Sequence, residues 1–197
     1  MTADDETLRV YDARAADYVE MIADAKLDQD LKAFLAPIPK GGRVLDLGCG
    51  PGNAAAQMRD RGYRVTAWDA SPEMVASARD LYGVEAQVAS FDDLRAEADF
   101  DGVWANFSLL HAPKSEMPRH LAAIHRALTP RGRLHLGLKT GEGERRDAIG
   151  RFYAYYTDAE ISGLLEAAGF TITSRRTGAE KGMDGTVAPW IVLAAHA

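Results

Sequence analysis

The chain has 197 residues, of which 47% are hydrophobic, and this size and composition suit a single globular domain with a buried core. Its formal net charge of −6 supplies no basic surface for a phosphate backbone, so nucleic-acid partners are disfavoured. The chain begins with acidic residues and has no run near ~18 apolar residues, so we expect a cytoplasmic protein without a membrane span. Its lone cysteine predicts neither an internal disulfide nor a cysteine-rich metal site.

The first forty residues predict two helices. An amphipathic pattern runs from Tyr11 to Ala23, and a second helix from Asp28 to Ala36 is stopped by Pro37 and Pro39. We expect residues 1–40 to form a helical lid.

Strands then alternate with helices. The predicted strands cover residues 44–47, 64–68, 84–90, 100–106 and 133–138. The predicted helices cover residues 72–82, with Ser71 as N-cap and Gly83 as terminator, 115–128, and 158–168, with a capping box at Thr157 and Gly169 as terminator. Such alternation indicates an α/β fold with a doubly wound, mostly parallel sheet between two helical layers.

Two further strands are predicted near the end of the chain, at Phe170–Arg175 and Val187–Ala194. They form an antiparallel hairpin, which completes a seven-stranded sheet with an antiparallel C-terminal strand. The segment from Thr140 to Gly150 is predicted to be the longest mobile loop. We therefore expect one domain, divided into the lid, a ligand-binding core at 41–140, and a substrate-side loop, helix and hairpin at 141–197.

Three alternating glycines follow the first strand, in the segment 43–53. Gly48, Gly50 and Gly52 can adopt positive φ and let a ligand approach bare backbone. The pattern is G-x-G-x-G, whereas the dinucleotide fingerprint G-x-G-x-x-G would place its third glycine at Asn53. This loop therefore favours a nucleotide-like ligand other than a dinucleotide.

Three carboxylates follow or end successive predicted strands: Asp46, Asp69 and Asp92. The carboxyl ends of parallel strands meet at one edge of a sheet, so these acids should converge there. At an effective dielectric of ~20, one carboxylate about 4 Å from a cation contributes on the order of 4 kcal/mol before desolvation. The edge therefore suits a ligand with a ribose diol and a positive charge, and disfavours phosphates.

Five segments together resemble the class I S-adenosylmethionine-dependent methyltransferases, in that family's order. They are residues 44–52, 68–74, 89–94, 100–106 and 128–134. The resemblance implies S-adenosylmethionine as cofactor, S-adenosylhomocysteine as product, no metal, and methyl transfer by in-line displacement. It also implies a lid segment with Tyr11 and Tyr18, although the spacing of these tyrosines is equally typical of core packing.

The predicted cofactor-binding residues are Tyr11, Tyr18, Asp46, Gly48, Cys49, Gly50, Pro51, Gly52, Asp69, Ala70, Ser71, Met74, Ser90, Phe91, Asp92, Asn106 and Phe107. Asp69 is placed to bind the ribose diol, and Asp92 either the adenine amino group or a helix N-terminus. Met74 and Phe91 either enclose the adenine or pack in the core.

The acceptor is expected to be a small molecule methylated on oxygen or a carboxyl group, or alternatively on nitrogen or sulfur. His111 is the candidate general base, or else closes the pocket. Arg151 and Tyr153 are candidate substrate-binding residues, by ion pairing and stacking, with a core strand as the alternative. A catalytically inactive cofactor-binding regulator and an NAD-dependent oxidoreductase are the other functions considered, and the chain is expected to be a monomer or homodimer.

Overall fold

A computed structural model describes residues 4–22 and 29–197. Within these ranges, seven strands form a sheet in the order β3-β2-β1-β4-β5-β9-β8. Their bounds are β1 (Arg43–Leu47), β2 (Arg64–Asp69), β3 (Gln87–Val88), β4 (Phe100–Asn106), β5 (Leu128–Lys139), β8 (Thr171–Lys181) and β9 (Val187–His196). Strand β9 runs antiparallel to β5 and β8, and the pairs among the first five strands are parallel. The predicted fold class is confirmed.

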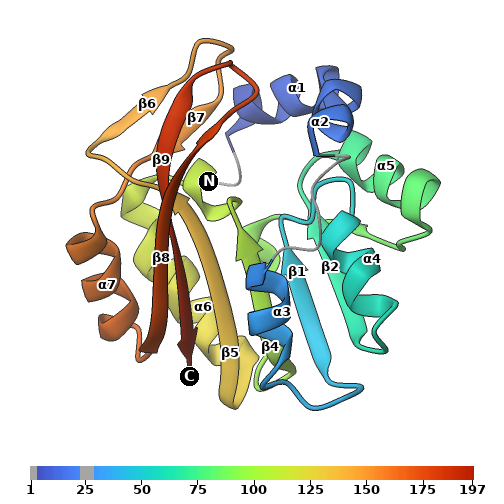
Figure 1. The fold of residues 1–197 in the computed structure, drawn as a ribbon, viewed down its shortest axis with the longest axis vertical. Helices are drawn as coiled ribbons and strands as arrows, with labels where there is room; N and C mark the ends of the chain where they lie inside the picture. Colours follow the sequence, from blue (N-terminus) through green and yellow to red (C-terminus); the bar gives the residue numbers. More distant parts are fainter. Residues whose placement is uncertain (1–3, 23–28) are drawn as a thin grey trace.

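Helices cover both faces of this sheet. The α-helices are α1 (Asp5–Ala13), α2 (Ala15–Ile22), α3 (Gln29–Leu35), α4 (Asn53–Arg59), α5 (Pro72–Tyr82), α6 (Met117–Ala127) and α7 (Asp158–Ala167). Short 3₁₀ turns are η1 (Phe91–Asp93), η2 (Leu109–His111) and η3 (Lys114–Glu116). Figure 1 shows α6 behind the sheet, α7 to the left of β8, and α3 in front of the sheet. No described helix has the length and apolar character needed to cross a bilayer.

The alternation of side chains along β1 builds the two layers. Leu45 and Leu47 belong to the core cluster that contains the buried residues of α6 and α7, whereas Val44 belongs to the cluster with α3. Successive strand residues point to opposite faces, so Asp46 lies on the same face as Val44. The sheet order reverses between β1 and β4, and this switch point is where open α/β sheets hold their ligands.

Two helix ends follow their sequence signals. The Ser71 hydroxyl accepts a hydrogen bond from the Met74 backbone N–H at 3.1 Å, and Gly83 ends α5 with a left-handed φ of 60°. Thr157 accepts one from the Glu160 N–H at 3.2 Å and opens α7. The predicted caps therefore set these boundaries.

The predicted N-terminal helix from Tyr11 to Ala23 is wrong in its bounds. The helix begins at Asp5, because the Asp4 carboxylate caps the Thr7 N–H at 2.8 Å, and it breaks at Arg14, where α1 gives way to α2. Ala23 lies outside the described residues. Asp28 also lies outside them, and the second predicted helix appears as α3.

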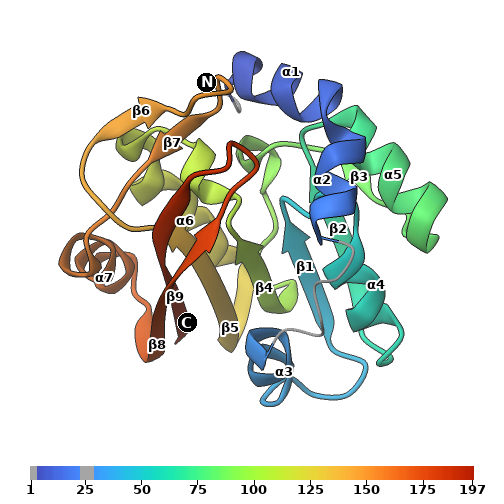
Figure 2. The ribbon, with the colours of Figure 1, turned by 45° about the horizontal axis from the view of Figure 1, so that its top comes forward.

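Figures 1 and 2 place α1 and α2 beyond the carboxyl ends of β1 and β2.

Three other predicted segments differ from the structure. The third strand spans only Gln87–Val88, because the chain turns from it into η1. The fifth strand starts five residues early, at Leu128, directly after α6. The predicted loop 140–150 contains β6 (Glu144–Arg146), which pairs with β7 (Phe152–Ala154) in a separate two-stranded sheet.

Candidate active site

The turn from β1 into α4 brings bare backbone to the switch point of the sheet. Gly48, Gly50 and Gly52 have φ values of 80°, 53° and 84°, a region that other residues rarely adopt. A Cβ on Gly48 would lie only 2.3 Å from the Cβ of Ser108. Conformation therefore favours glycine at all three positions, as predicted, and space also requires it at Gly48 and Gly52, where an added Cβ on Gly52 would lie 2.8 Å from the Cβ of Ala78.

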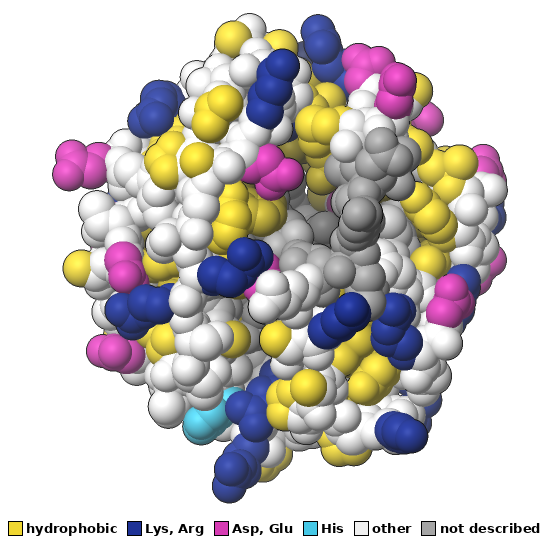
Figure 3. All heavy atoms as spheres, in the orientation of Figure 1, with side chains coloured by type: hydrophobic (Ala, Val, Ile, Leu, Met, Phe, Trp, Pro, Cys, Tyr) yellow, Lys and Arg dark blue, Asp and Glu magenta, His cyan; other side chains and the backbone are white. Residues whose placement is uncertain are grey.

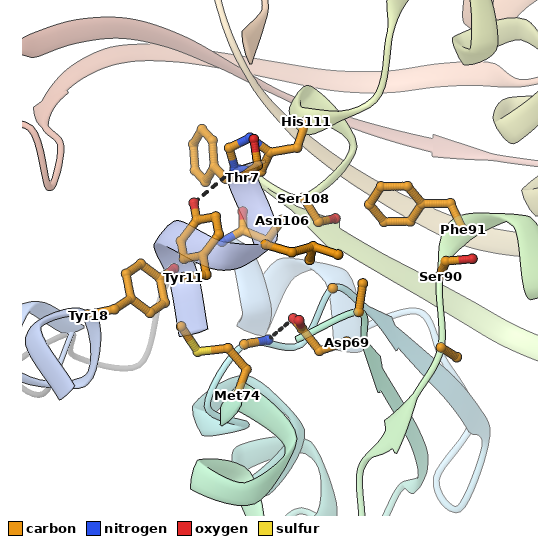
Figure 4. A pocket seen from close by; sticks show the side chains of 16 residues that line it. Thr7, Tyr11, Tyr18, Asp69, Met74, Ser90, Phe91, Asn106, Ser108 and His111 are labelled. Atoms are coloured by element: carbon orange, nitrogen blue, oxygen red, sulfur yellow. Dashed lines mark hydrogen bonds between the residues drawn. The ribbon is translucent and has the colours of Figure 1, made fainter. Parts of the chain in front are cut away.

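Asp69 holds this turn in place. Its Oδ2 accepts a hydrogen bond from the Gly50 N–H at 2.8 Å, drawn dashed in Figure 4, and its Oδ1 accepts one from the Ser71 N–H at 2.9 Å. Burial raises the pKa of Asp69, and these backbone hydrogen bonds oppose the rise. One carboxylate thus fixes the glycine loop and keeps lone pairs available for hydroxyl donors.

Asp46 is the least satisfied acid at this edge. Its side chain is 2% exposed, and its Oδ2 has no hydrogen-bond partner among the described residues. Burial, and then the charge of Asp69, raises its pKa to about 8. Ionising a buried carboxyl with an unpaired oxygen is costly, and a cationic ligand would offset that cost. The donor set therefore fits a positively charged ligand.

A cavity adjoins these groups beneath α1, and Figure 4 shows it from close by. Its volume is about 90 Å³, because side chains of α1 and α2 enter the space beside the glycine loop. It is lined by Thr7, Leu8, Tyr11, Tyr18, Gly48, Gly50, Asp69, Ala70, Met74, Ala89, Ser90, Phe91, Asn106, Phe107, Ser108 and His111.

Three predicted cofactor residues lie outside the lining of the two cavities described here. Asp92 forms an ion pair with Arg119, and Gly52 lies at the start of α4 against Ala78. Ser71 binds Asp69 through its backbone N–H and donates its hydroxyl proton to Asp12. Ser71 therefore acts on the site through Asp69.

His111 takes part in a chain of hydrogen bonds that joins α1 to β7. Its Nδ1 lies 2.6 Å from the carbonyl oxygen of Phe152, which can only accept, so Nδ1 carries the proton. Its Nε2 then accepts the hydroxyl proton of Tyr11 at 2.9 Å, and the Tyr11 oxygen accepts a hydrogen bond from Arg151 at 3.0 Å. Burial lowers the pKa of His111 to about 4, so the imidazole is neutral near pH 7.

Arg151 is occupied by protein partners. Its Nη2 lies 2.7 Å from the Asp147 carboxylate, and both side chains are less than 5% exposed. Arg151 thus braces Tyr11 from within the protein, although it also borders a second cavity. The ring of Tyr153 lies beside His111, with 4.6 Å between ring centroids.

The second cavity adjoins the first and has a volume of about 670 Å³, within the range of about 300–1,000 Å³ typical of ligand pockets. Figure 3 shows a hollow near the middle of this face, with hydrophobic side chains on its rim. Both cavities are bordered by Tyr11, Tyr18, Gly48, Gly50, Asn106, Phe107 and His111. The second cavity is also bordered by Asp46, Cys49, Pro51, Lys139, Arg151, Tyr153 and Trp190, among others.

A buried histidine on β5 fixes the side chain of Asn106. The His135 Nε2–H donates to the Asn106 Oδ1 at 2.8 Å, which fixes the amide at the end of β4. Burial lowers the pKa of His135 to about 3, so that ring is neutral as well. In the described ranges, no three His, Cys, Asp or Glu side chains are grouped to hold a metal ion.

Sequence reasoning missed several lining residues. Thr7 and Leu8 precede the predicted first helix, and the Asp4 cap was the signal that could have placed them. Lys139 ends the fifth strand, so the rule that ligands bind at strand carboxyl ends could have found it. Trp190 enters the site through the pairing of β9 with β5, which no local pattern reveals.

Comparisons with known proteins agree with this geometry. Residues 44–132 match the family model described as "Methyltransferase domain". An uncharacterized methyltransferase of Staphylococcus carnosus (strain TM300) is 30% identical over 127 residues, which cover 64% of this chain and 59% of that protein. A ubiquinone biosynthesis O-methyltransferase of Xanthomonas oryzae pv. oryzae is 40% identical over 104 residues, which cover 49% of this chain and 42% of that protein. The match thus spans less than two thirds of these relatives' lengths.

A solved structure extends the similarity to nearly the whole chain. The 1,6-didemethyltoxoflavin-N1-methyltransferase of Burkholderia thailandensis, solved with 1,6-didemethyltoxoflavin and S-adenosylhomocysteine bound, superposes with a TM-score of 0.77 at 27% identity. The alignment covers 97% of this chain and 87% of that one. The chain with this strand order, glycine turn and acidic strand ends is thus similar to methyltransferases both in its segment 44–132 and in its overall fold.

Proposed function

We propose that this protein transfers the methyl group of S-adenosylmethionine to a small-molecule acceptor. The observation that carries the proposal is the buried Asp46 carboxyl beside the glycine turn, whose Oδ2 has no hydrogen-bond partner among the described residues. A cationic cofactor would supply the missing partner, whereas the pyrophosphate of a dinucleotide would add negative charge next to Asp46 and Asp69. An NAD-dependent oxidoreductase is therefore disfavoured.

The residues present divide the cofactor between them. Gly48 and Gly50 offer backbone to it, Asp69 would accept the ribose hydroxyls, and Asp46 would face its positive charge. Met74 and Phe91 border the first cavity and offer apolar contacts to the adenine. When bound, S-adenosylmethionine supplies an electrophilic methyl carbon, which forms a bond to the acceptor while the electron pair of the carbon–sulfur bond returns to sulfur.

The second cavity supports a small acceptor. It meets the first cavity at Asn106, Phe107 and His111, so an acceptor held there would lie beside the cofactor's reacting end. Methyl transfer gains most from alignment of the reacting atoms, and fixed side chains provide it. Phe107 has a left-handed φ of 54°, a costly conformation for a residue with a Cβ, held by hydrogen bonding of its N–H to the Gly137 carbonyl at 3.0 Å.

His111 contributes to this alignment through Tyr11. Its Nε2 lone pair is engaged by the Tyr11 hydroxyl, and a pKa of about 4 makes the imidazole a weak base. We therefore assign His111 the role of positioning Tyr11, in preference to removing a proton. A His111→Gln variant should therefore lower kcat. The pH profile of its kcat/KM should have the same shape between pH 5 and 8 as that of the unaltered protein, because His111 does not titrate in this range.

Two measurements test the proposal. Isothermal titration calorimetry should detect binding of S-adenosylhomocysteine and none of NADH at millimolar concentration. Incubation with isotopically labelled S-adenosylmethionine and a small-molecule library, followed by mass spectrometry, should detect a labelled product. Binding of NADH in place of S-adenosylhomocysteine would overturn the proposal, and binding without any turnover would support a cofactor-binding regulator.

A further inference from the structure

A half-buried lysine stands at the acceptor end of the second cavity. Lys139 is the last residue of β5, and in the antiparallel register its Cα partner on β9 is Trp190. Directly paired residues project to the same face of a sheet, so the ammonium and the indole stand side by side at the cavity wall. This places a cation next to a large aromatic surface.

Lys139 has no carboxylate in ion-pair contact among the residues that the structure describes. Its Nζ lies 3.8 Å from the centroid of the Tyr153 ring, a cation–π contact. Burial and then the charge of Arg151 lower its pKa, and the carboxylates of Asp184 and Asp147 oppose that effect only in part. An anion bound at Nζ would therefore gain a partner that the protein does not already occupy.

The two guanidinium groups that border this cavity have carboxylate partners. Arg151 is paired with Asp147, and Arg176 is paired with Asp30. The exposed Lys181 also borders the cavity, whereas Lys139 is half-buried there, in contact with the Tyr153 ring and without an ion-paired carboxylate among the described residues.

Aromatic rings on separate elements border the same space. Phe107 follows β4, Tyr153 lies on β7, and Trp190 lies on β9, with Phe107 and Trp190 in edge-to-face contact at 6.3 Å. Trp190 packs directly over Gly178. An added Cβ there would lie 2.4 Å from the indole, so the glycine leaves the room that this ring position needs. Flat walls of this kind favour a flat, unsaturated ligand.

We infer that the acceptor is a planar aromatic or heteroaromatic molecule that carries a negative charge, and that Lys139 determines this specificity by binding the anionic group. The inference rests on the proposed function and names its substrate class.

The test uses aromatic acids and their uncharged counterparts as probes. Benzoate, salicylate, 1-naphthoate and quinoline-2-carboxylate, each beside its carboxamide, are titrated into the protein saturated with S-adenosylhomocysteine. We expect at least one carboxylate to bind about tenfold or more tightly than its carboxamide, the size of one hydrogen bond to a charged group. Lys139→Met should remove this preference, Lys139→Arg should largely retain it, and Lys40→Met, an exposed lysine elsewhere, should leave it unchanged.

The outcomes separate the inference from the proposed function. If S-adenosylhomocysteine binds but no carboxylate does, or each carboxylate and carboxamide bind alike, the inference is overturned and the proposed function stands. Retention of the preference in Lys139→Met would also overturn it. If S-adenosylhomocysteine itself fails to bind the unaltered protein, the proposed function fails.

Discussion

Binding of a cationic cofactor should be linked to release of a proton from Asp46. The pKa of Asp46 is raised from 3.8 to about 8, so at pH 7 the free protein holds this carboxyl about nine-tenths protonated. A cation bound beside it favours the carboxylate, and the proton must then leave. If the bound-state pKa falls below about 5, affinity should rise about fiftyfold between pH 6 and pH 8, and nearly one proton should be released at pH 7.

Calorimetry in phosphate and in Tris measures this directly, because the two buffers differ in their heat of ionisation. S-Adenosylmethionine and S-adenosylhomocysteine are titrated at several pH values between 6 and 8.5. In the Asp46→Asn variant, cofactor affinity should fall, and it should depend less on pH. Any pH dependence that remains is attributed to Asp69. Asp80→Asn, at an exposed acid of α5, serves as the matched control. An enthalpy independent of buffer, with an affinity flat over this range, would refute the reasoning.

The same shift predicts the stability of the cofactor-free protein. Because the folded-state pKa of Asp46 lies above its unfolded value, its contribution to folding is complete below about pH 4 and is lost as pH rises toward about 8. At pH 7 the penalty is on the order of 4 kcal/mol, from about three pKa units. The Tm without cofactor should fall between pH 6 and pH 8, and should fall less in Asp46→Asn.

Three substitutions test the turn and the N-terminal helices. Gly48→Ala should lower the free energy of unfolding in urea by about 2–4 kcal/mol and abolish S-adenosylhomocysteine binding, because it adds both backbone strain and the close contact with Ser108. Gly62→Ala is the control, because Gly62 has a similar φ but open space around it, and it should cost only about 1 kcal/mol. Equal losses in the two would contradict this. Tyr11→Phe should lower stability by about 1–2 kcal/mol and reduce kcat more than it changes KM, because His111 loses its hydroxyl partner; an unchanged kcat would refute the positioning role. Arg146→Ala removes a bidentate ion pair to Asp4, the cap of α1, and should speed amide hydrogen exchange in α1 but not in β1. Exchange in α1 as slow as in the unaltered protein would contradict this prediction.

The fold and the turn could be predicted because their signals are local. Glycines with positive φ, an acid at the end of β2 and the Ser71 cap each act within a few residues, and the structure places them as predicted. The β6–β7 hairpin was missed because residues 144–146 are all charged and show no alternation typical of a strand. They form a strand only because they pair with β7.

The environment of single side chains depends on distant partners and was less accessible. Asp92 faces Arg119 and Arg151 faces Asp147 and Tyr11, so their predicted ligand roles compete with contacts that no spacing in the sequence announces. The neutral state of His111 likewise follows from burial beneath residues a hundred positions away.

The wall formed by α1 and α2 constrains the order of events during turnover. Tyr11 and Tyr18 border both cavities, and the first cavity is far smaller than an adenosyl group requires. Side chains of α1 and α2 would therefore have to move aside for a bound adenosyl group, and they would then border both the cofactor and the acceptor. We accordingly expect steady-state kinetics with both substrates varied to show ordered binding, with the cofactor first.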